Sequence, residues 1–325
     1  MLKTFQSNLL HVGKKAYRLP GWVIKRLVQT NYYTARAYYL RNLRRADSRY
    51  EASPLLVHQM GKVASSSVTR SLTVANIDRR IYHTHSLRPE MIEIYERKRR
   101  GYLGTDREGD LRHIWQYRYL REWIERGLEK GKKWQVVTLI RDPIARNISD
   151  FFENMEMLSP PSERDHILRS IEYDFEVTVV DSDIKELMDI FIEKFPHDYP
   201  ARYLDLEVKG VFGVDLYTGD FPTTKGYKVY RGSEADVLLI RLEDLNDCFA
   251  EAFQEFLNIE GLTLVNRNVG SQKEYAGIYH MFKNSIYLSE PFVDKMYSSR
   301  FVRHFYSEAE INRFKARWCR ESAVR

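Results

Sequence analysis

The chain contains few cysteines: only Cys248 and Cys319 occur among its 325 residues. Two cysteines in a chain of this length do not make a disulfide framework, so we expect a reducing compartment. No run of 18 or more apolar residues occurs, which argues against a membrane-spanning helix. The first residues lack the apolar core of a signal peptide, so we expect a cytoplasmic location.

Internal repeats and low-complexity segments are also missing. With 43% apolar residues, the chain can bury a large core in one or two domains. The charge is distributed unevenly along the chain. Residues 1–50 contain eleven Lys and Arg residues and one acidic residue, which gives a net charge of +10. Because the whole chain carries +6, the other 275 residues carry 6 − 10 = −4. We therefore expect a basic helical extension over residues 1–50 and an α/β domain over residues 51–325.

The basic segment also carries aromatic residues, among them Trp22, Tyr38 and Tyr39. Basic and aromatic residues interleaved in this way suit a helix on an anionic membrane or on a polyanionic glycan. A helix that packs on the main domain with its charges in water is the third interpretation. No recognised nucleic-acid-binding module accompanies the charge, so we expect no nucleic-acid partner.

A strand, a turn of small residues and a helix follow one another early in the second region. The apolar run Leu55–Val57 predicts a buried strand, and Val68 and Leu72 have the spacing of one helix face. Gly61, Lys62 and three serines lie between them. The first N–H groups of a helix have no internal partner, and the helix dipole is positive there. This geometry therefore suits a phosphate group.

The same stretch is compatible with an ordinary turn in which a serine caps the helix. It is not a Walker A loop, which has a first glycine five residues before its Gly-Lys-Ser/Thr end. Here Val63 follows Lys62, and no glycine lies five residues before Gly61. The hydroxyl that holds magnesium beside the lysine of a Walker A loop is therefore missing.

A second predicted strand, Val136–Ile140, ends in Arg141. Asp142 and Pro143 favour the start of a helix directly after it. Ser149 lies eight residues after Arg141, which is about two helical turns. Ligands of open α/β sheets bind at the carboxyl ends of strands. The two strand ends together therefore predict sites for two phosphate groups.

The stretches QMGKVASSSV and LIRDPIARNISDFF resemble the two cofactor motifs of sulfotransferases that use 3′-phosphoadenylyl sulfate (PAPS). The first is similar to the loop for the 5′-phosphosulfate, and the second to the 3′-phosphate site. The resemblance is greatest to carbohydrate sulfotransferases and to capsular polysaccharide synthesis proteins, and it extends thinly over residues 54–318. It implies a P-loop-like parallel sheet flanked by helices, with transfer of sulfate to a glycan hydroxyl and no metal.

The resemblance also assigns roles to residues. Lys62 is implied to neutralise the leaving phosphate, while Arg141 and Ser149 hold the 3′-phosphate. Lys273 and Tyr275 belong to a polar segment similar to the loop that closes over the cofactor. Many members of the family have glycine at the position where this chain has Ala64. The implied cofactor-binding residues are Lys62, Val63, Ala64, Ser65, Ser66, Ser67, Arg141, Ser149, Lys273 and Tyr275.

Two histidines, His83 and His85, follow the short predicted strand Ile81-Tyr82. Residues two apart on a strand point to the same side. Transfer to a hydroxyl needs a base, which histidine can supply near neutral pH. In glycan 2-O-sulfotransferases a His-x-His at this place supplies the base, which implies His85 as the first candidate and His83 as the second. A structural pair is the alternative, and without a third ligand we expect no zinc.

Residues 200–232 are rich in glycine, aromatic and β-branched residues, which predicts β-hairpins or a substrate insertion. Within them, Asp205 and Glu207 are an alternative base, ligands of acceptor hydroxyls, or an ordinary solvated pair. Further on, the stretch 236–245 predicts a core strand whose Arg241 forms a structural ion pair. Ser307 and Glu310 have the spacing of a capping box.

These patterns predict a PAPS-dependent sulfotransferase that acts on a carbohydrate hydroxyl. One alternative is a P-loop phosphotransferase of the kinase type, which needs magnesium and for which the hydroxyl after Lys62 is missing. Another is a non-catalytic protein that binds a polyanion or a membrane through residues 1–50. No pattern specifies the acceptor, the sulfated position or the oligomeric state.

Overall fold

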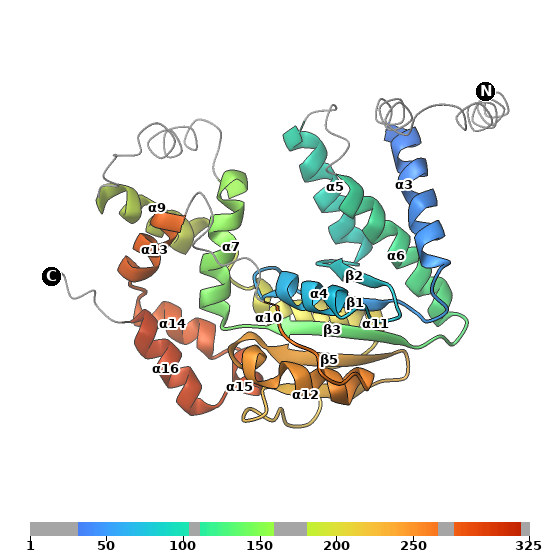
Figure 1. The fold of residues 1–325 in the computed structure, drawn as a ribbon. Coiled ribbons are helices and arrows are strands. Elements are labelled where there is room, and N and C mark those ends of the chain that lie inside the picture. The colour runs from blue at the N-terminus through green and yellow to red at the C-terminus, as the bar shows by residue number, and fades with distance from the viewer. Residues whose placement is uncertain (1–31, 104–110, 159–180, 266–275, 320–325) are drawn as a thin grey trace. The chain divides into compact units, whose positions relative to one another are not determined.

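The structure, a computed structural model, describes residues 32–103, 111–158, 181–265 and 276–319. The chain divides into two compact units. The first contains Met1–Glu51 and Leu87–Arg126, and the second contains Ala52–Ser86 and Gly127–Arg325. The second unit holds a five-stranded sheet with flanking helices (Figure 1), which confirms the predicted α/β class.

The sheet has the strand order β2-β1-β3-β5-β4. Its strands are β1 (Leu55–His58), β2 (Ile81–Thr84), β3 (Trp134–Ile140), β4 (Tyr227–Arg231) and β5 (Ala235–Arg241). β1 pairs in parallel with β2 and β3, and β3 pairs in parallel with β5, whereas β4 is antiparallel to β5. Parallel strands are covered on both faces, which explains why β1, β3 and β5 are apolar runs in the sequence.

The strand order reverses between β1 and β3. From β1 the chain passes through α4 (Ser65–Val74) to β2 on one side, and from β3 through α7 (Pro143–Leu158) towards β5 on the other. In open α/β sheets this reversal leaves a crevice at the carboxyl ends of the two strands, where ligands bind. Both stretches with predicted phosphate-binding residues begin there.

The remaining elements of the second unit are mostly helices. They are α9 (Asp181–Lys194), α10 (Tyr199–Tyr203), the π-helix η3 (Leu204–Lys209), α11 (Gly210–Phe212), the 3-10 helix η4 (Leu242–Asp244), α12 (Leu245–Leu257), α13 (Ala276–Ser285), α14 (Glu290–Tyr297), α15 (Arg300–Phe305) and α16 (Glu308–Trp318). α12 packs against β4 and β5, and α14 packs against α15 and α16.

The hairpin prediction for residues 200–232 is wrong in its first half. Residues 199–212 form the continuous helical segment α10-η3-α11, and only β4 pairs with β5 as a hairpin. The buried residues Tyr203, Leu204, Val208, Val211 and Phe212 recur at helical spacing. Burial of this stripe outweighs the local preference of glycine and β-branched residues for turns and strands.

Two predicted structural pairs are confirmed in the second unit. Arg241 is 1% exposed, and its Nε donates to Asp244 Oδ2 over 2.6 Å. Its Nη1 donates to Glu310 Oε2 over 3.0 Å. Glu310 also forms the predicted capping box with Ser307 at the start of α16. A buried arginine needs such partners, and these bonds join the end of β5 to the C-terminal helices.

The first unit is helical in its described residues, with α3 (Tyr32–Asp47), α5 (Pro89–Leu103) and α6 (Arg112–Leu128). α6 contacts both other helices. The rings of Tyr39 and Trp115 lie 5.9 Å apart, and Arg118 Nη2 lies 2.6 Å from Glu96 Oε2. Of the predicted basic extension, Tyr32–Asp47 is the helix α3, and residues 1–31 lie outside the described part.

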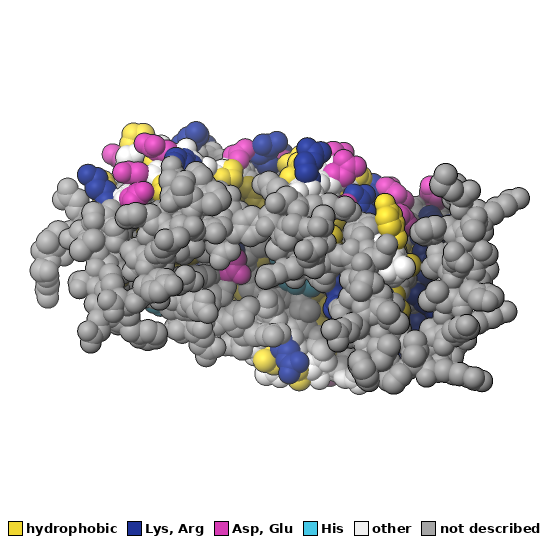
Figure 2. Space-filling view, turned by 90° about the horizontal axis from the view of Figure 1, so that it is seen from above, with side chains coloured by type: hydrophobic (Ala, Val, Ile, Leu, Met, Phe, Trp, Pro, Cys, Tyr) yellow, Lys and Arg dark blue, Asp and Glu magenta, His cyan; other side chains and the backbone are white. Residues whose placement is uncertain are grey.

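Charges of both signs lie on the face of the molecule seen in Figure 2. Along the upper edge of this view, Lys and Arg side chains lie among Asp and Glu side chains. Across the described residues, no helix has the length and apolar character needed to cross a membrane. The cytoplasmic location stays a prediction.

Candidate functional site

The loop between β1 and α4 has an unusual backbone. Lys62 and Ala64 have φ values of 71° and 64°, in the left-handed region. This conformation costs an L-residue about 1–2 kcal/mol. Left-handed residues next to right-handed ones turn successive N–H groups into a concave anion-binding nest. Ala64 is also the N-cap of α4 and makes no side-chain cap bond, so the alternative of a serine cap is wrong.

Three side chains from neighbouring elements hold the carbonyl oxygens of this loop. Arg141 Nη1, at the end of β3, donates to the Lys62 carbonyl oxygen over 3.1 Å. Arg146 Nε, from α7, donates to the Gly61 carbonyl oxygen over 3.2 Å. His85 Nδ1 lies 2.9 Å from the Gln59 carbonyl oxygen. These three bonds restrain the backbone of the loop.

Arg141 is the predicted phosphate-binding residue that contacts this loop from another element. Ser65 and Ser67 are 7% and 5% exposed in the first turn of α4, whose first N–H groups lack intrahelical partners. The bond from Arg141 to the Lys62 carbonyl brings the two strand ends together. Ser149 lies half-buried on α7.

Lys62 makes an ion pair with a residue of α7. Its Nζ lies 3.1 Å from Glu153 Oε2 of α7, and the two side chains are 20% and 44% exposed. Such a pair is weak because both groups remain partly in water. An anion in the loop can therefore displace Glu153. Lys273 and Tyr275 lie outside the described residues.

The sequence analysis missed Arg146. This residue is 2% exposed and pairs with Asp150 over 3.1 Å while it holds the loop. Its one local signal in the sequence was the i, i+4 spacing from Asp150, which is also typical of an ordinary surface pair. Asp142 is likewise buried, and it accepts hydrogen bonds from Tyr297 Oη over 2.7 Å and from the Ile144 N–H over 3.1 Å.

His83 and His85 lie next to each other, as predicted, with ring centroids 4.6 Å apart. A carbonyl oxygen only accepts, so His85 Nδ1 carries the proton of its bond to Gln59. In the neutral ring Nε2 is then the basic atom. Burial lowers the pKa of His85, which keeps this ring neutral near pH 7. Burial and the neighbouring histidines lower the pKa of His83 to about 3, which makes His83 a poor base near pH 7.

The burial of His83 predicts a pH-dependent loss of stability. Its pKa is about 3 in the folded protein and 6.5 when unfolded, so below pH 6.5 the unfolded chain binds the extra proton. Between pH 7.5 and pH 5, His83 alone is expected to lower the free energy of unfolding by about 2 kcal/mol. Urea unfolding of wild type and His83→Gln across this range measures the effect as the difference between two curves. His280→Gln, at an exposed histidine, is the control, and equal slopes in all three proteins would contradict the assignment.

A buried polar cluster lies next to the two histidines. His58, at the end of β1, is 0% exposed, and its Nδ1 lies 2.9 Å from Thr84 Oγ1. Its Nε2 lies 3.5 Å from Glu207 Oε2. Ser86 Oγ donates to the other carboxylate oxygen of Glu207. The cluster therefore joins the ends of β1 and β2 to the π-helix η3.

The structure corrects one interpretation of the acidic pair. Asp205 is exposed, whereas Glu207 is 2% exposed and hydrogen-bonded, so they are not a solvated pair. The sequence analysis missed His58, a lone histidine at the end of an apolar strand. π-helices are rare and occur frequently at functional sites. Here the π-helix carries Glu207 to the carboxyl end of the sheet.

Gln59, directly after β1, is 0% exposed. Neither its Oε1 nor its Nε2 has a hydrogen-bond partner among the described residues. An unpartnered buried amide costs about 1–3 kcal/mol. The crevice beside β1 therefore retains hydrogen-bonding capacity that a ligand could use.

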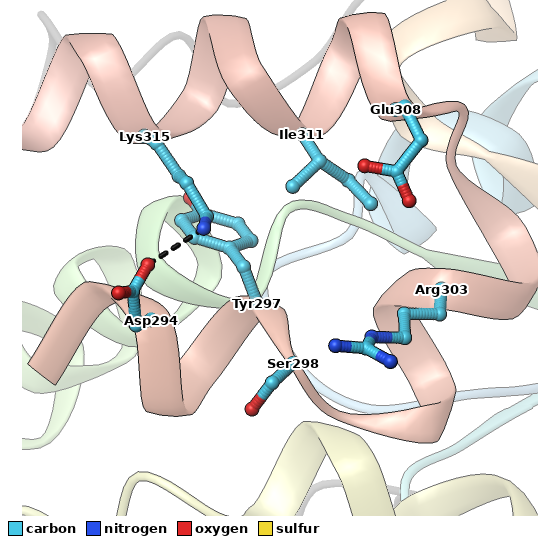
Figure 3. Close-up of a pocket in the computed structure, with 7 residues that line it drawn as sticks. All are labelled: Asp294, Tyr297, Ser298, Arg303, Glu308, Ile311 and Lys315. Atoms are coloured by element: carbon cyan, nitrogen blue, oxygen red, sulfur yellow. Dashed lines mark hydrogen bonds and ion pairs between the residues drawn. The ribbon is translucent and has the colours of Figure 1, made fainter. Parts of the chain in front are cut away.

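A separate cavity of about 310 Å³ lies among α14, α15 and α16 (Figure 3). Lys315 Nζ lies 2.6 Å from Asp294 Oδ1 at its edge. It is lined by Asp294, Tyr297, Ser298, Arg303, Glu308, Ile311 and Lys315. None of these is a predicted site residue. The described residues also contain no group of three His, Cys, Asp or Glu side chains that could hold a metal ion.

Comparison with protein families gives one match. A family with the description putative capsular polysaccharide synthesis protein matches residues 174–307, which is less than half of the chain. The matched part contains η3 with Glu207 and the strands β4 and β5, but neither the β1-α4 loop nor His85. Comparisons with curated proteins and with solved structures give no match. The match supports a role connected with a glycan.

Proposed function

We propose that this protein transfers the sulfuryl group of PAPS to a hydroxyl group of a polysaccharide or another carbohydrate. The observation that carries the proposal is the hydrogen bond from Arg141 Nη1 to the Lys62 carbonyl oxygen. It joins the residues that resemble a 5′-phosphosulfate loop to those that resemble a 3′-phosphate site. A ligand with phosphate groups at both ends of its ribose needs two such anion sites close together. The glycan acceptor is supported by the family match to residues 174–307.

The residues at the sheet edge fit such a ligand. The left-handed Lys62 and Ala64 shape an anion nest, and the amide of Gln59 offers unfilled hydrogen-bonding capacity. The N-terminus of α4 and the serine hydroxyls would hold the 5′-phosphate. Arg141 and Ser149 would hold the 3′-phosphate. The planar guanidinium group of arginine can donate two parallel hydrogen bonds to a phosphate. PAPS itself would supply the sulfuryl group and a good leaving group.

The protein then contributes placement and charge. Sulfuryl transfer should follow the pattern of phosphoryl transfer, in which charge moves onto the leaving group. Lys62 would leave Glu153 and neutralise that charge. His85 would accept the acceptor proton at Nε2, because its Nδ1 proton is held by the Gln59 carbonyl. His83 is the second candidate base, and Glu207 the third.

The kinase alternative is less well supported. A P-loop phosphotransferase would need a carboxylate near a strand end to hold magnesium, and Asp142 follows β3 by two residues. Both of its oxygens already accept hydrogen bonds, from Tyr297, from the Ile144 N–H and from Trp318 Nε1 over 3.2 Å. Its carboxylate therefore has a structural role at the start of α7.

Thermal unfolding with 3′,5′-diphosphoadenosine in EDTA tests the proposed cofactor. At a concentration 100 times its Kd, this product should stabilise the folded state by about 2.7 kcal/mol and raise Tm. ATP and AMP should not match this rise. Arg141→Lys should abolish it, because a lysine cannot replace the bidentate fork. Arg231→Lys, in an ion pair on β4, is the matched control and should keep the rise.

Two results would reject the proposal. One is no rise in Tm at millimolar diphosphoadenosine. The other is a rise with ATP that requires magnesium, which would favour the kinase alternative. If diphosphoadenosine still raises the Tm of Arg141→Lys, the ligand is supported but Arg141 is not part of its binding site.

A further inference from the structure

One face of α3, in the first unit, is strongly basic. Arg41, Arg44 and Arg45 are exposed on the helix, and Arg49 is exposed directly after it. At 100° per residue Arg41, Arg44 and Arg45 fall within one half of the helix circumference, and Arg49 lies in the turn after the helix. We call them the α3 arginine face. Tyr38, 44% exposed, lies on the same half.

The other half of α3 faces the interior of the first unit. Ala35 and Leu43 are 9% and 6% exposed there. Asp47, which is the one acidic residue of α3, accepts a hydrogen bond from Tyr119 Oη over 2.7 Å. The exposed half of the helix is therefore left without a negative charge.

The arginines of α3 differ from those of α6. On α6, Arg121 lies 2.6 Å from Glu125, and Arg126 lies 3.8 Å from Glu122. None of the four arginines of the α3 arginine face makes an ion pair within the described part of the chain. Like charges gathered without counter-charges repel one another, so an anionic partner gains from binding all of them.

We propose that the α3 arginine face binds an acidic polysaccharide, which it would hold as the acceptor polymer on the same chain. Arginine forks bind carboxylate and sulfate groups with two parallel hydrogen bonds. A repeating anionic chain can contact several arginines along one helix. The choice of a polysaccharide rests on the proposed function. The exposure of the four arginines and their lack of ion pairs within the described residues are independent of the proposed function.

An anionic membrane is the less suitable partner. A helix that lies in a membrane interface buries an apolar face among the lipids. On α3 the apolar residues Ala35 and Leu43 already pack inside the protein. Its outward half carries arginine, tyrosine and small or polar residues instead. Binding to such a surface is therefore governed by charge and by hydrogen bonds.

The experiment measures binding of the full-length chain to alginate, a polymer of uronic acids, without PAPS. Arg41→Gln/Arg45→Gln is expected to weaken binding about tenfold. Arg121→Gln/Arg126→Gln removes the same charge from the paired arginines of α6 and should change binding less than twofold. Raising the salt concentration should weaken wild-type binding, and neutral dextran should not bind.

Three outcomes would overturn the inference. They are equal losses in the two double variants, equal binding of neutral dextran, and tighter binding to phosphatidylglycerol vesicles or RNA than to alginate. The rise in Tm with diphosphoadenosine is measured on the same proteins and should be unchanged in both variants. If the wild-type chain does not bind alginate but shows the rise in Tm with diphosphoadenosine, only the inference is rejected. If alginate binding changes in the variants as expected but the wild type shows no rise, only the proposed function is rejected.

Discussion

Replacing Lys62 by methionine is expected to lower the turnover of sulfuryl transfer by about 10³-fold or more. Lys62 belongs to the loop before α4, and its ammonium group is proposed to leave Glu153 and to neutralise the charge that the leaving phosphate gains. Methionine keeps the length of the side chain, and as an L-residue it meets the same left-handed backbone as lysine. The variant therefore removes the charge with little other change. The measurement is release of diphosphoadenosine at saturating PAPS with an acceptor that supports turnover.

Two further variants make the result specific to Lys62. Lys225→Met removes the same charge from an exposed ion pair with Glu255 and should leave turnover within twofold. Glu153→Gln removes the partner that holds Lys62 at 3.1 Å, and it should bind diphosphoadenosine at least as tightly as wild type. Turnover of Lys62→Met within tenfold of wild type would contradict the proposed role. A loss of affinity in Glu153→Gln would show that this ion pair positions the lysine and does not compete with the ligand.

Much of the sheet could be predicted because its strands are buried on both faces. Leu55–Val57 and Val136–Ile140 are short apolar runs for that reason, and β1 and β3 extend them by one or two residues. The helical segment of residues 199–212 could not be predicted in the same way. Its glycines and β-branched residues favour turns and strands locally, and only the tertiary burial of one stripe makes it a helix.

The site shows the same division between local and long-range information. The strand-turn-helix patterns around Lys62 and Arg141 are local, and each could be found within about fifteen residues. That the two lie together depends on the strand order, which no local pattern gives. Glu207 shows the limit most clearly, since its hydrogen bond to Ser86 spans 121 positions of the sequence. The sequence therefore could not decide whether Glu207 is solvated or buried.

Replacing His85 by glutamine is expected to lower turnover by about 10²–10⁴-fold, the usual contribution of a general base. Glutamine can still donate to the Gln59 carbonyl but cannot accept the proton of the acceptor. Binding of diphosphoadenosine should therefore survive, which separates a base from a cofactor ligand. His83→Gln should keep turnover within a few-fold, because a group with a pKa of about 3 is a poor base near pH 7.

The pH dependence of turnover distinguishes His85 from Glu207. Because burial lowers the pKa of His85 from 6.5, turnover should fall only below pH 6.5, as Nε2 takes up a proton. That acid limb should be absent from the residual activity of His85→Gln. Glu207→Gln should retain the limb if Glu207 only positions Ser86 and His58. A greater loss in Glu207→Gln than in His85→Gln, with the limb gone, would make Glu207 the base. Loss of diphosphoadenosine binding in His85→Gln would instead place His85 among the residues that hold the cofactor.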